Sequence, residues 1–146
     1  MRKQLLLLIG LTVCFMVIMA GCGSSDGSNV KIDYGTSELY TQEDMDAAIK
    51  VIEDEFSTWE GCELKNIRYT SDDANNDDNI AWLNSIAEGK ELSGNYTQCI
   101  EFLSDFHSPA EPAADSAWEA DTDYTDWQWY LARTDGGSWE LVTNGY

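Results

Sequence analysis

The sequence has little positive charge and almost no histidine. Its 146 residues include one histidine, His107, and eight lysines and arginines against 27 aspartates and glutamates. A single histidine excludes zinc motifs that are built on two histidines. The formal net charge of −19 argues against nucleic acid as a partner, because a polyanion is bound by a basic surface. It also argues against docking of side chains to anionic lipid.

The motifs of several enzyme classes are missing as well. The chain has no glycine-rich phosphate loop, no nucleophile elbow and no Cys-x-x-Cys pair. His107 follows Phe106 at the end of a predicted strand, where it is either a general base beside Asp105 or an exposed loop residue. The sequence therefore favours a non-catalytic domain.

The apolar run at the start of the chain is too short for a permanent membrane anchor. It extends from Leu5 to Ala20, which is 16 residues, whereas a spanning helix needs about 20. The run follows the basic pair Arg2-Lys3 and ends in small residues. This arrangement is typical of an export signal.

The end of this signal, Met19-Ala20-Gly21-Cys22, resembles the bacterial lipobox. Met19 stands where the lipobox usually has leucine. The resemblance implies that residues 1–21 are removed and that the Cys22 thiol receives a diacylglyceryl group. The protein would then be anchored through lipid to the cell membrane, on its extracytoplasmic face. Ordinary secretion without a lipid is the alternative.

Residues 22–39 are predicted to be a flexible tether, because they begin with a polar stretch rich in glycine and serine. Residues 40–146 are predicted to fold as one domain. Thr41 and Asp44 form a capping-box pattern, which predicts a helix over 42–59 that ends before Gly61. Apolar residues then recur at spacings of three and four, as one face of a helix requires: Met45, Ala48, Ile49, Ile52, Phe56 and Trp59.

The rest of the domain alternates in ways that favour strands. Strands are predicted at 62–69, 96–106, 126–133 and 138–143, with a short helix at 79–87 and loops at 71–78 and 108–123. The spacing of apolar residues predicts a bulge near Lys65-Asn66, and Asp135-Gly136-Gly137 predicts a hairpin turn. The fold class is therefore α+β, with a long N-terminal amphipathic helix packed on a curved antiparallel sheet.

The initial helix and the closing hairpin, from Trp127 to Val142, resemble the nuclear-transport-factor-two-like folds. These include ketosteroid-isomerase-like and polyketide-cyclase-like domains. The resemblance implies a cone-like domain with a pocket open at one end. Tyr69, Phe102, Trp127 and Trp129 are candidate lining residues of that pocket. Packing of the hairpin against the helix is the alternative role for these aromatic side chains.

Two cysteines remain in the predicted domain, Cys62 and Cys99. Outside the cell such a pair can be oxidised, and a bridge would close a loop of about 38 residues and stabilise the fold by roughly 3–4 kcal/mol. Two separate buried thiols are the alternative.

The segment that contains Asp73, Asn75 and Asp77 offers oxygen ligands at alternate positions, as a calcium loop does. Asp78 and Asn84, however, stand where such a loop has its glycine and its closing glutamate. A solvated entry to a helix is the alternative, because acids are favoured there by the helix dipole. No other cofactor is indicated.

These patterns support three hypotheses. The first is an exported, membrane-anchored lipoprotein with a small non-catalytic ligand-binding or interaction domain, whose ligand or protein partner the sequence does not specify. The second is a small pocket enzyme of the ketosteroid-isomerase or cyclase type, which would use a pocket carboxylate of raised pKa. The third is a calcium-binding cell-wall protein.

Overall fold

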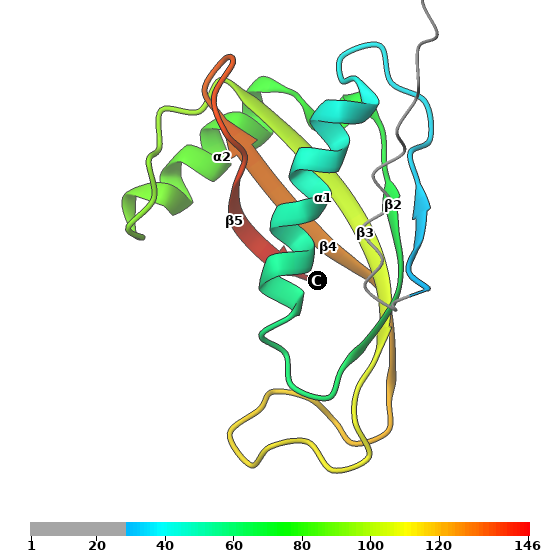
Figure 1. Cartoon of the computed structure of the whole chain (residues 1–146). Coiled ribbons are helices and arrows are strands. Elements are labelled where there is room, and N and C mark those ends of the chain that lie inside the picture. The colour runs from blue at the N-terminus through cyan, green and yellow to red at the C-terminus, as the bar shows by residue number, and fades with distance from the viewer. Residues whose placement is uncertain (1–28) are drawn as a thin grey trace, which may run out of the picture.

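Five strands and two α-helices make up the part of the chain that the computed structural model describes, residues 29–146 (Figure 1). The predicted signal at 1–21 and the predicted lipid site at Cys22 lie outside the described residues. The fold is α+β, and one short 3-10 helix, η1, completes it. In chain order the elements are β1 (Lys31–Asp33), α1 (Gln42–Phe56), β2 (Glu63–Tyr69), η1 (Asp72–Ala74), α2 (Asp77–Glu88), β3 (Gln98–His107), β4 (Asp123–Arg133) and β5 (Glu140–Gly145).

The strands form one mixed sheet in the order β1-β2-β3-β4-β5. The pairs from β2 to β5 are antiparallel, as predicted, but β1 pairs with β2 in parallel. The prediction of a wholly antiparallel sheet was therefore wrong at this edge. A strand of three residues leaves no alternation in the sequence, so its pairing with Asn66–Arg68 could not be predicted locally.

The predicted tether at 22–39 extends too far, because the folded domain begins before residue 40. Val30, Ile32 and Tyr34 pack against the main core. Farther along, the Ser37 hydroxyl and the Glu38 backbone N–H both donate to the carboxylate of Asp72. This segment is therefore held to the sheet and to the start of η1.

The helix α1 begins with the predicted capping box. The Asp44 N–H donates to the Thr41 hydroxyl at 3.2 Å, and the Asp44 carboxylate accepts from the Thr41 N–H at 3.1 Å. The helix ends at Phe56, three residues earlier than predicted. The hydroxyls of Ser57 and Thr58 donate to backbone carbonyls of the last turn, which is the competition by which such residues disfavour helix interiors.

The main core lies between α1 and one face of the sheet, across which α1 runs in Figure 1. The predicted apolar stripe is buried there from Met45 to Phe56, and Ala48 and Ile52 are fully inaccessible. Trp59, its last predicted member, lies beyond the helix and is only partly buried. Burying a side chain of the size of Ile52 contributes about 1.5–3 kcal/mol. The sheet supplies alternate residues of β2, β3 and β4, namely Ile67, Tyr69, Ile100, Phe102, Phe106, Trp129 and Leu131.

A second, smaller core lies between α2 and the opposite face of the sheet. Successive residues of a strand point to opposite faces, so Cys99, Ala132 and Val142 turn away from α1 and pack against Leu83 and Ala87 of α2. The helix begins at Asp77, two residues earlier than predicted, because the Asn76 side chain caps it. The two helices therefore cover opposite faces, and α2 covers one end only (Figure 1).

Irregularities in the ladder fall at three places. The register shifts between Leu64 and Asn66, which confirms the predicted bulge. Further shifts lie at Ser104–Phe106 and at Tyr130–Leu131. The predicted turn after β4 is also confirmed, since Gly136 has φ +70° and the Gly137 N–H donates to the Thr134 carbonyl at 2.8 Å.

The prediction of a Cys62–Cys99 disulfide was wrong, and both cysteines are free. In the β2–β3 register Glu63 pairs with His107 and Tyr69 pairs with Phe102. Cys62 and Cys99 therefore lie beyond opposite ends of the stretch over which β2 pairs with β3, whereas a disulfide requires Cα atoms within about 7 Å of each other. Burial raises the pKa of Cys99 to about 11, and its thiol donates to the Ala74 carbonyl at 2.8 Å.

None of the described helices is long and apolar enough to cross a membrane.

Candidate ligand-binding site

The candidate site is a group of aromatic rings where β3 and β4 are joined by the irregular loop 108–122. Trp118 comes from this loop and is only partly exposed. Four rings that also contact one another pack against it, and we call these four the aromatic box. Their centroids lie 4.8 to 5.6 Å from that of Trp118, and they belong to Trp59, Phe106, Tyr124 and Trp127.

Three parts of the chain contribute to the box. Trp59 lies just after α1, where the early end of the helix turns its ring back over Phe106. Tyr124 stacks on Phe106 at 4.8 Å, with an interplanar angle of 7°. The indole N–H of Trp127 donates to Asn144 at 3.2 Å, so β5 fixes this ring. Three rings of the box thus belong to β3 and β4, Trp59 belongs to the turn after α1, and Trp118 is supplied by the loop 108–122.

The base of the loop is closed by the fully buried Ser108. Its backbone N–H donates to the Thr122 carbonyl at 2.9 Å, and its hydroxyl donates to the Glu119 carbonyl at 2.5 Å. The same hydroxyl accepts from the Thr122 N–H. The Glu119 N–H in turn donates to the Tyr124 hydroxyl at 2.9 Å. The loop is therefore fixed at its two ends by neutral hydrogen bonds.

One polar atom of the loop is buried without a partner. The hydroxyl oxygen of Ser116 is inaccessible to solvent and makes no hydrogen bond in the described structure. A buried hydroxyl without a partner costs about 1–3 kcal/mol. The buried Ser116 hydroxyl therefore destabilises the closed position of the loop, two residues from Trp118.

The four predicted pocket residues do not line one common cavity. Tyr69, Phe102 and Trp129 lie side by side across β2, β3 and β4, and each is buried in the main core. The Trp129 indole N–H donates to the Ser104 hydroxyl at 2.8 Å. Trp127 alone belongs to the box. Packing, the alternative stated for these residues, is thus the role of the other three.

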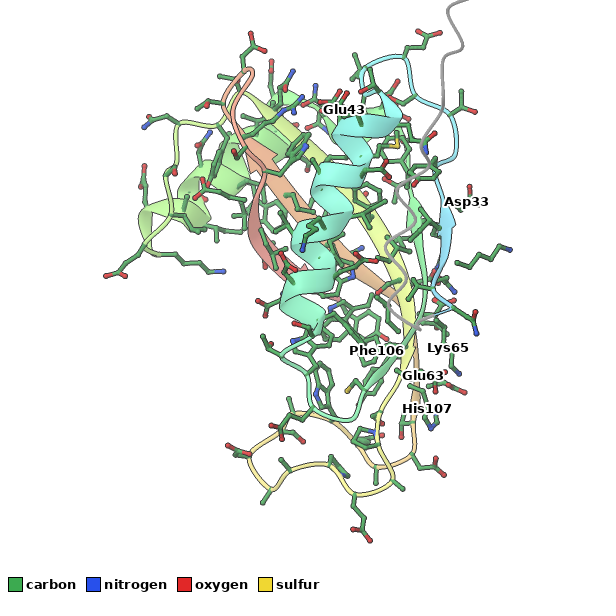
Figure 2. All side chains as sticks on the ribbon, viewed as in Figure 1. Asp33, Glu43, Glu63, Lys65, Phe106 and His107 are labelled. Atoms are coloured by element: carbon green, nitrogen blue, oxygen red, sulfur yellow. The ribbon has the colours of Figure 1, made fainter. Side chains whose placement is uncertain are left out.

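His107 is at the end of β3, on the face opposite the box. Figure 2 shows Phe106 on the helix side of the sheet and His107, with Lys65, on the outer side. The imidazole lies 2.9 Å from the Asp123 carboxylate and 3.0 Å from that of Asp121. These hydrogen bonds, first with Asp123 and then with Asp121, raise the pKa of His107.

Asp105, the predicted partner of His107, belongs to a different group of side chains. It accepts from Asn66 at 2.7 Å and from Arg68 at 3.2 Å. Burial by itself raises the pKa of Asp105, but hydrogen bonds from Asn66, the Asp126 backbone and Arg68 hold it below its usual value. An ionised carboxylate with these partners is a poor general acid, and it lies outside the box.

The predicted calcium ligands are distributed over three local structures. Asp73 lies in η1, Asn75 caps it, and Asp77 begins α2. The Asn75 side-chain oxygen accepts from the Cys99 N–H at 2.9 Å and is thereby committed to the fold. Within residues 29–146 no group of three or more His, Cys, Asp or Glu side chains is arranged to hold a metal ion.

A cavity of about 270 Å³ lies at the other end of the sheet, next to the β4–β5 turn. Both oxygens of its one carboxylate are already engaged, since Glu140 accepts from the Tyr96 hydroxyl at 3.0 Å and from the Ser93 N–H at 3.3 Å. The aromatic box is therefore the stronger candidate site.

Comparison of the chain with protein-family models, with curated proteins and with solved structures finds no match in any of the three. The argument for function therefore depends on the geometry of the box. From the sequence Trp59 was predicted on the apolar stripe of the first helix and Trp118 in the loop 108–123, and both were among the tryptophans that could line a pocket, although neither was among the four candidate lining residues. The one available signal was an isolated tryptophan within an acidic segment that also contains both prolines.

Proposed function

We propose that this protein is an exported, lipid-anchored, non-catalytic binding domain whose ligand site is the aromatic box beneath the loop 108–122. One observation carries the proposal: Trp118, from an irregular loop, packs on a cluster of four rings that come from β3, β4 and the turn after α1. Binding sites are concave, mostly apolar and held by a rigid scaffold. Movement of the loop would produce such a concavity.

The lipobox-like end of the N-terminal signal supports the anchor. Cys22 would bear the lipid on the extracytoplasmic side, and the residues between it and β1 would separate the domain from the membrane. The proposal includes the cone-like form that the nuclear-transport-factor-two-like resemblance implies. The three register shifts support it, because bulges bend strands.

The chemistry near the box supports binding rather than catalysis. The box itself consists of aromatic side chains, and His107 and Asp105 lie on the opposite face of the sheet with partners of their own. An enzyme of the ketosteroid-isomerase type would require a carboxylate that faces the rings.

Hydrogen exchange tests whether the loop 108–122 opens as a lid over the aromatic box. The amides of Glu119, Asp121 and Thr122 are protected by bonds at the loop base. If the loop opens alone, these amides exchange much faster than those of β3 and β4, and low urea does not accelerate them. Exchange at the rate of the strands would contradict the proposal.

A matched pair of variants sharpens this test. Ser108→Ala removes the hydroxyl that closes the loop, so the loop amides should exchange faster while the α2 amides do not. Ser85→Ala removes a similar bond, from the Ser85 hydroxyl to the Trp82 carbonyl on α2, and should leave the loop amides unchanged.

Intact mass spectrometry of the protein from its native membrane tests the anchor. The expected mass begins at Cys22 and includes a diacylglyceryl group, and Cys22→Ser should lose both the lipid and the membrane association. A lipid-free mass from the unaltered chain would reject the anchor without bearing on the box.

A further inference from the structure

A cavity of about 270 Å³ lies between the connection from α2 to β3 and the turn from β4 to β5. Its lining residues are Ser93, Tyr96, Thr134, Ser138 and Glu140. It lies at the opposite end of the sheet from the aromatic box and shares no residue with it. Pockets for drug-sized ligands measure about 300–1,000 Å³, so this cavity has room for a smaller ligand, about the size of one sugar ring.

The wall of the cavity is held in place by hydrogen bonds within the fold. The Tyr96 backbone N–H donates to the Asn84 side chain at 2.7 Å, and the Asn84 amide donates back to the Tyr96 carbonyl at 3.0 Å. Tyr96 is only 3% exposed, and its hydroxyl donates to the Glu140 carboxylate at 3.0 Å. The Ser93 N–H donates to the other carboxylate oxygen at 3.3 Å. The carboxylate is therefore fixed in one orientation.

Three side-chain hydroxyls of the lining make no hydrogen bond among residues 29–146. They belong to Ser93, Thr134 and Ser138, and all three residues are exposed. Each hydroxyl can donate one hydrogen bond and accept two. The Glu140 carboxylate has about four acceptor positions, of which the bonds from Tyr96 and Ser93 use two. The cavity therefore offers both donors and acceptors to a ligand.

The chemistry of the lining separates the classes of ligand. Its one charged side chain is the Glu140 carboxylate, and it has no lysine, arginine or histidine, so it disfavours anions. It offers little to an apolar ligand, because Tyr96, its one aromatic residue, is almost wholly buried. An ammonium group matches the carboxylate but carries donors only, so it leaves the protons of the three free hydroxyls without an acceptor. A sugar hydroxyl both donates and accepts, and it matches the whole lining.

From these observations we propose that the cavity binds one neutral sugar ring. Two adjacent hydroxyls of the ring donate to the two free acceptor positions of Glu140, and its other oxygens accept from Ser93, Thr134 and Ser138. The carboxylate is already oriented before the ligand arrives, which lowers the entropic cost of binding. The cavity is a second site and goes beyond the proposed function, because binding there does not require the loop 108–122 to open.

Three matched sugars test the class. They are the methyl α-pyranosides of glucose, mannose and galactose, of which the last two differ from the first in the orientation of one hydroxyl each. Binding is followed by nitrogen–proton NMR on the full chain in a polyoxyethylene detergent, which contains no sugar. At least one glycoside should shift the Ser93 and Gly137 amides with a Kd of about 1 mM or tighter. No shift from any of the three at about 20 mM, or shifts confined to the aromatic box, would overturn the proposal.

Two further probes separate the remaining ligand classes. The first, trans-4-aminocyclohexanol, is a six-membered ring with an ammonium group, and the second, cyclohexanol, is the same ring with a single hydroxyl. Both should bind more weakly than the best of the three glycosides, because neither can engage all the hydroxyls of the lining. Tighter binding of the amine would reject the sugar and indicate a cation, and tighter binding of cyclohexanol would indicate an apolar ligand.

Thr134→Val tests the free hydroxyls. It replaces the hydroxyl with a methyl group of similar size, so the glycoside should bind at least about threefold more weakly, which is the lower range of one hydrogen bond. The side chain makes no hydrogen bond among the described residues, so the melting temperature should not change. Thr125→Val, on β4 and outside the cavity, is the matched control and should leave binding unchanged.

Glu140→Gln tests the carboxylate. The variant keeps an acceptor for the Tyr96 hydroxyl but loses the charge and one acceptor oxygen, so the glycoside should bind at least about fivefold more weakly. Glu91→Gln removes an exposed acid outside the cavity and should have no effect. Unchanged affinity in folded Thr134→Val and Glu140→Gln chains would overturn the assignment of the sugar to this cavity.

Discussion

His107 and Asp123 stand opposite each other in the β3–β4 register, and the imidazole Nδ1 lies 2.9 Å from the Asp123 carboxylate. The pair joins the two ends of the loop that covers the aromatic box, on the opposite face of the sheet. Two more residues extend this pair to a cluster of four charged side chains. Asp121 contacts the other imidazole nitrogen, and Lys65 contacts Asp123 at 2.6 Å.

This cluster predicts a pH dependence of stability. The pKa of His107 is raised by Asp123 and Asp121, so its contribution is complete below the unfolded value of about 6.5 and is lost as the pH rises through the folded value. The pKa of Asp123 is lowered, first by Lys65 and then by His107, so its contribution is lost only in acid. The difference in melting temperature between the unaltered chain and His107→Gln should shrink as the pH rises from about 5.5 to about 9.

Lys65→Gln is the control for this prediction. It removes a partner of Asp123 that stays charged over the whole range, so its effect on the melting temperature should be nearly constant. Because the cluster is exposed, both effects should be small and reduced by salt. A His107→Gln difference that does not change with pH would show that the imidazole contributes no charge to the loop base.

The bond between Trp129 and Ser104 predicts a larger effect in the core. Both side chains are fully buried, and the indole N–H donates to the hydroxyl at 2.8 Å. Ser104→Ala leaves that N–H without an acceptor and should lower the free energy of unfolding by about 1–3 kcal/mol. In the Trp129→Phe background the same change should cost much less. Urea denaturation measures both values, and equal costs would show that the bond is not what Ser104 supplies.

The two cysteines should differ in reactivity. Cys62 is half-buried, whereas Cys99 is fully buried and its thiol is bonded to the Ala74 carbonyl. The thiolate is the reactive form, and burial raises the pKa of Cys99 to about 11. Iodoacetamide should therefore modify Cys62 first, and Cys99 only on unfolding, as mapped by mass spectrometry of peptides. A peptide cross-linked through Cys62 and Cys99 in the native chain would contradict the register of β2 and β3.

Local signals in the sequence predicted local structure well. The capping box of Thr41 and Asp44, the bulge beside Lys65 and the turn at Gly136 each depend on a few adjacent residues. Backbone geometry and short-range hydrogen bonds set such features, so a few adjacent residues are enough to predict each of them.

Features that depend on distant pairing could not be predicted in this way. The strand β1 has three residues, and these residues form a strand only because they pair with β2. The separation of Cys62 from Cys99 follows from the offset between two strands. The box is the clearest case, because the rings around Trp118 come from three separate segments and share no sequence period.

Arg133 provides a test of how α1 is joined to the hairpin. Its guanidinium lies 4.1 Å from the centroid of the Trp139 ring, and it donates to Asp44 at 2.9 Å and to Gln98 at 2.7 Å. A planar fork can stack and donate in several directions, whereas an ammonium acts as a point charge. Arg133→Lys should therefore destabilise the fold by about 1–2 kcal/mol even though the charge is kept.

Lys50→Met is the matched control. Lys50 pairs with Asp54 on the exposed side of α1, the helix that Arg133 contacts through Asp44. Loss of an exposed pair of this kind has little measurable effect. Chemical denaturation of the two variants should therefore separate a stacked, partly buried arginine from a surface charge. If Arg133→Lys proved as stable as the unaltered chain, charge alone would account for the contact with Asp44, and the stacking on Trp139 would contribute nothing to the junction.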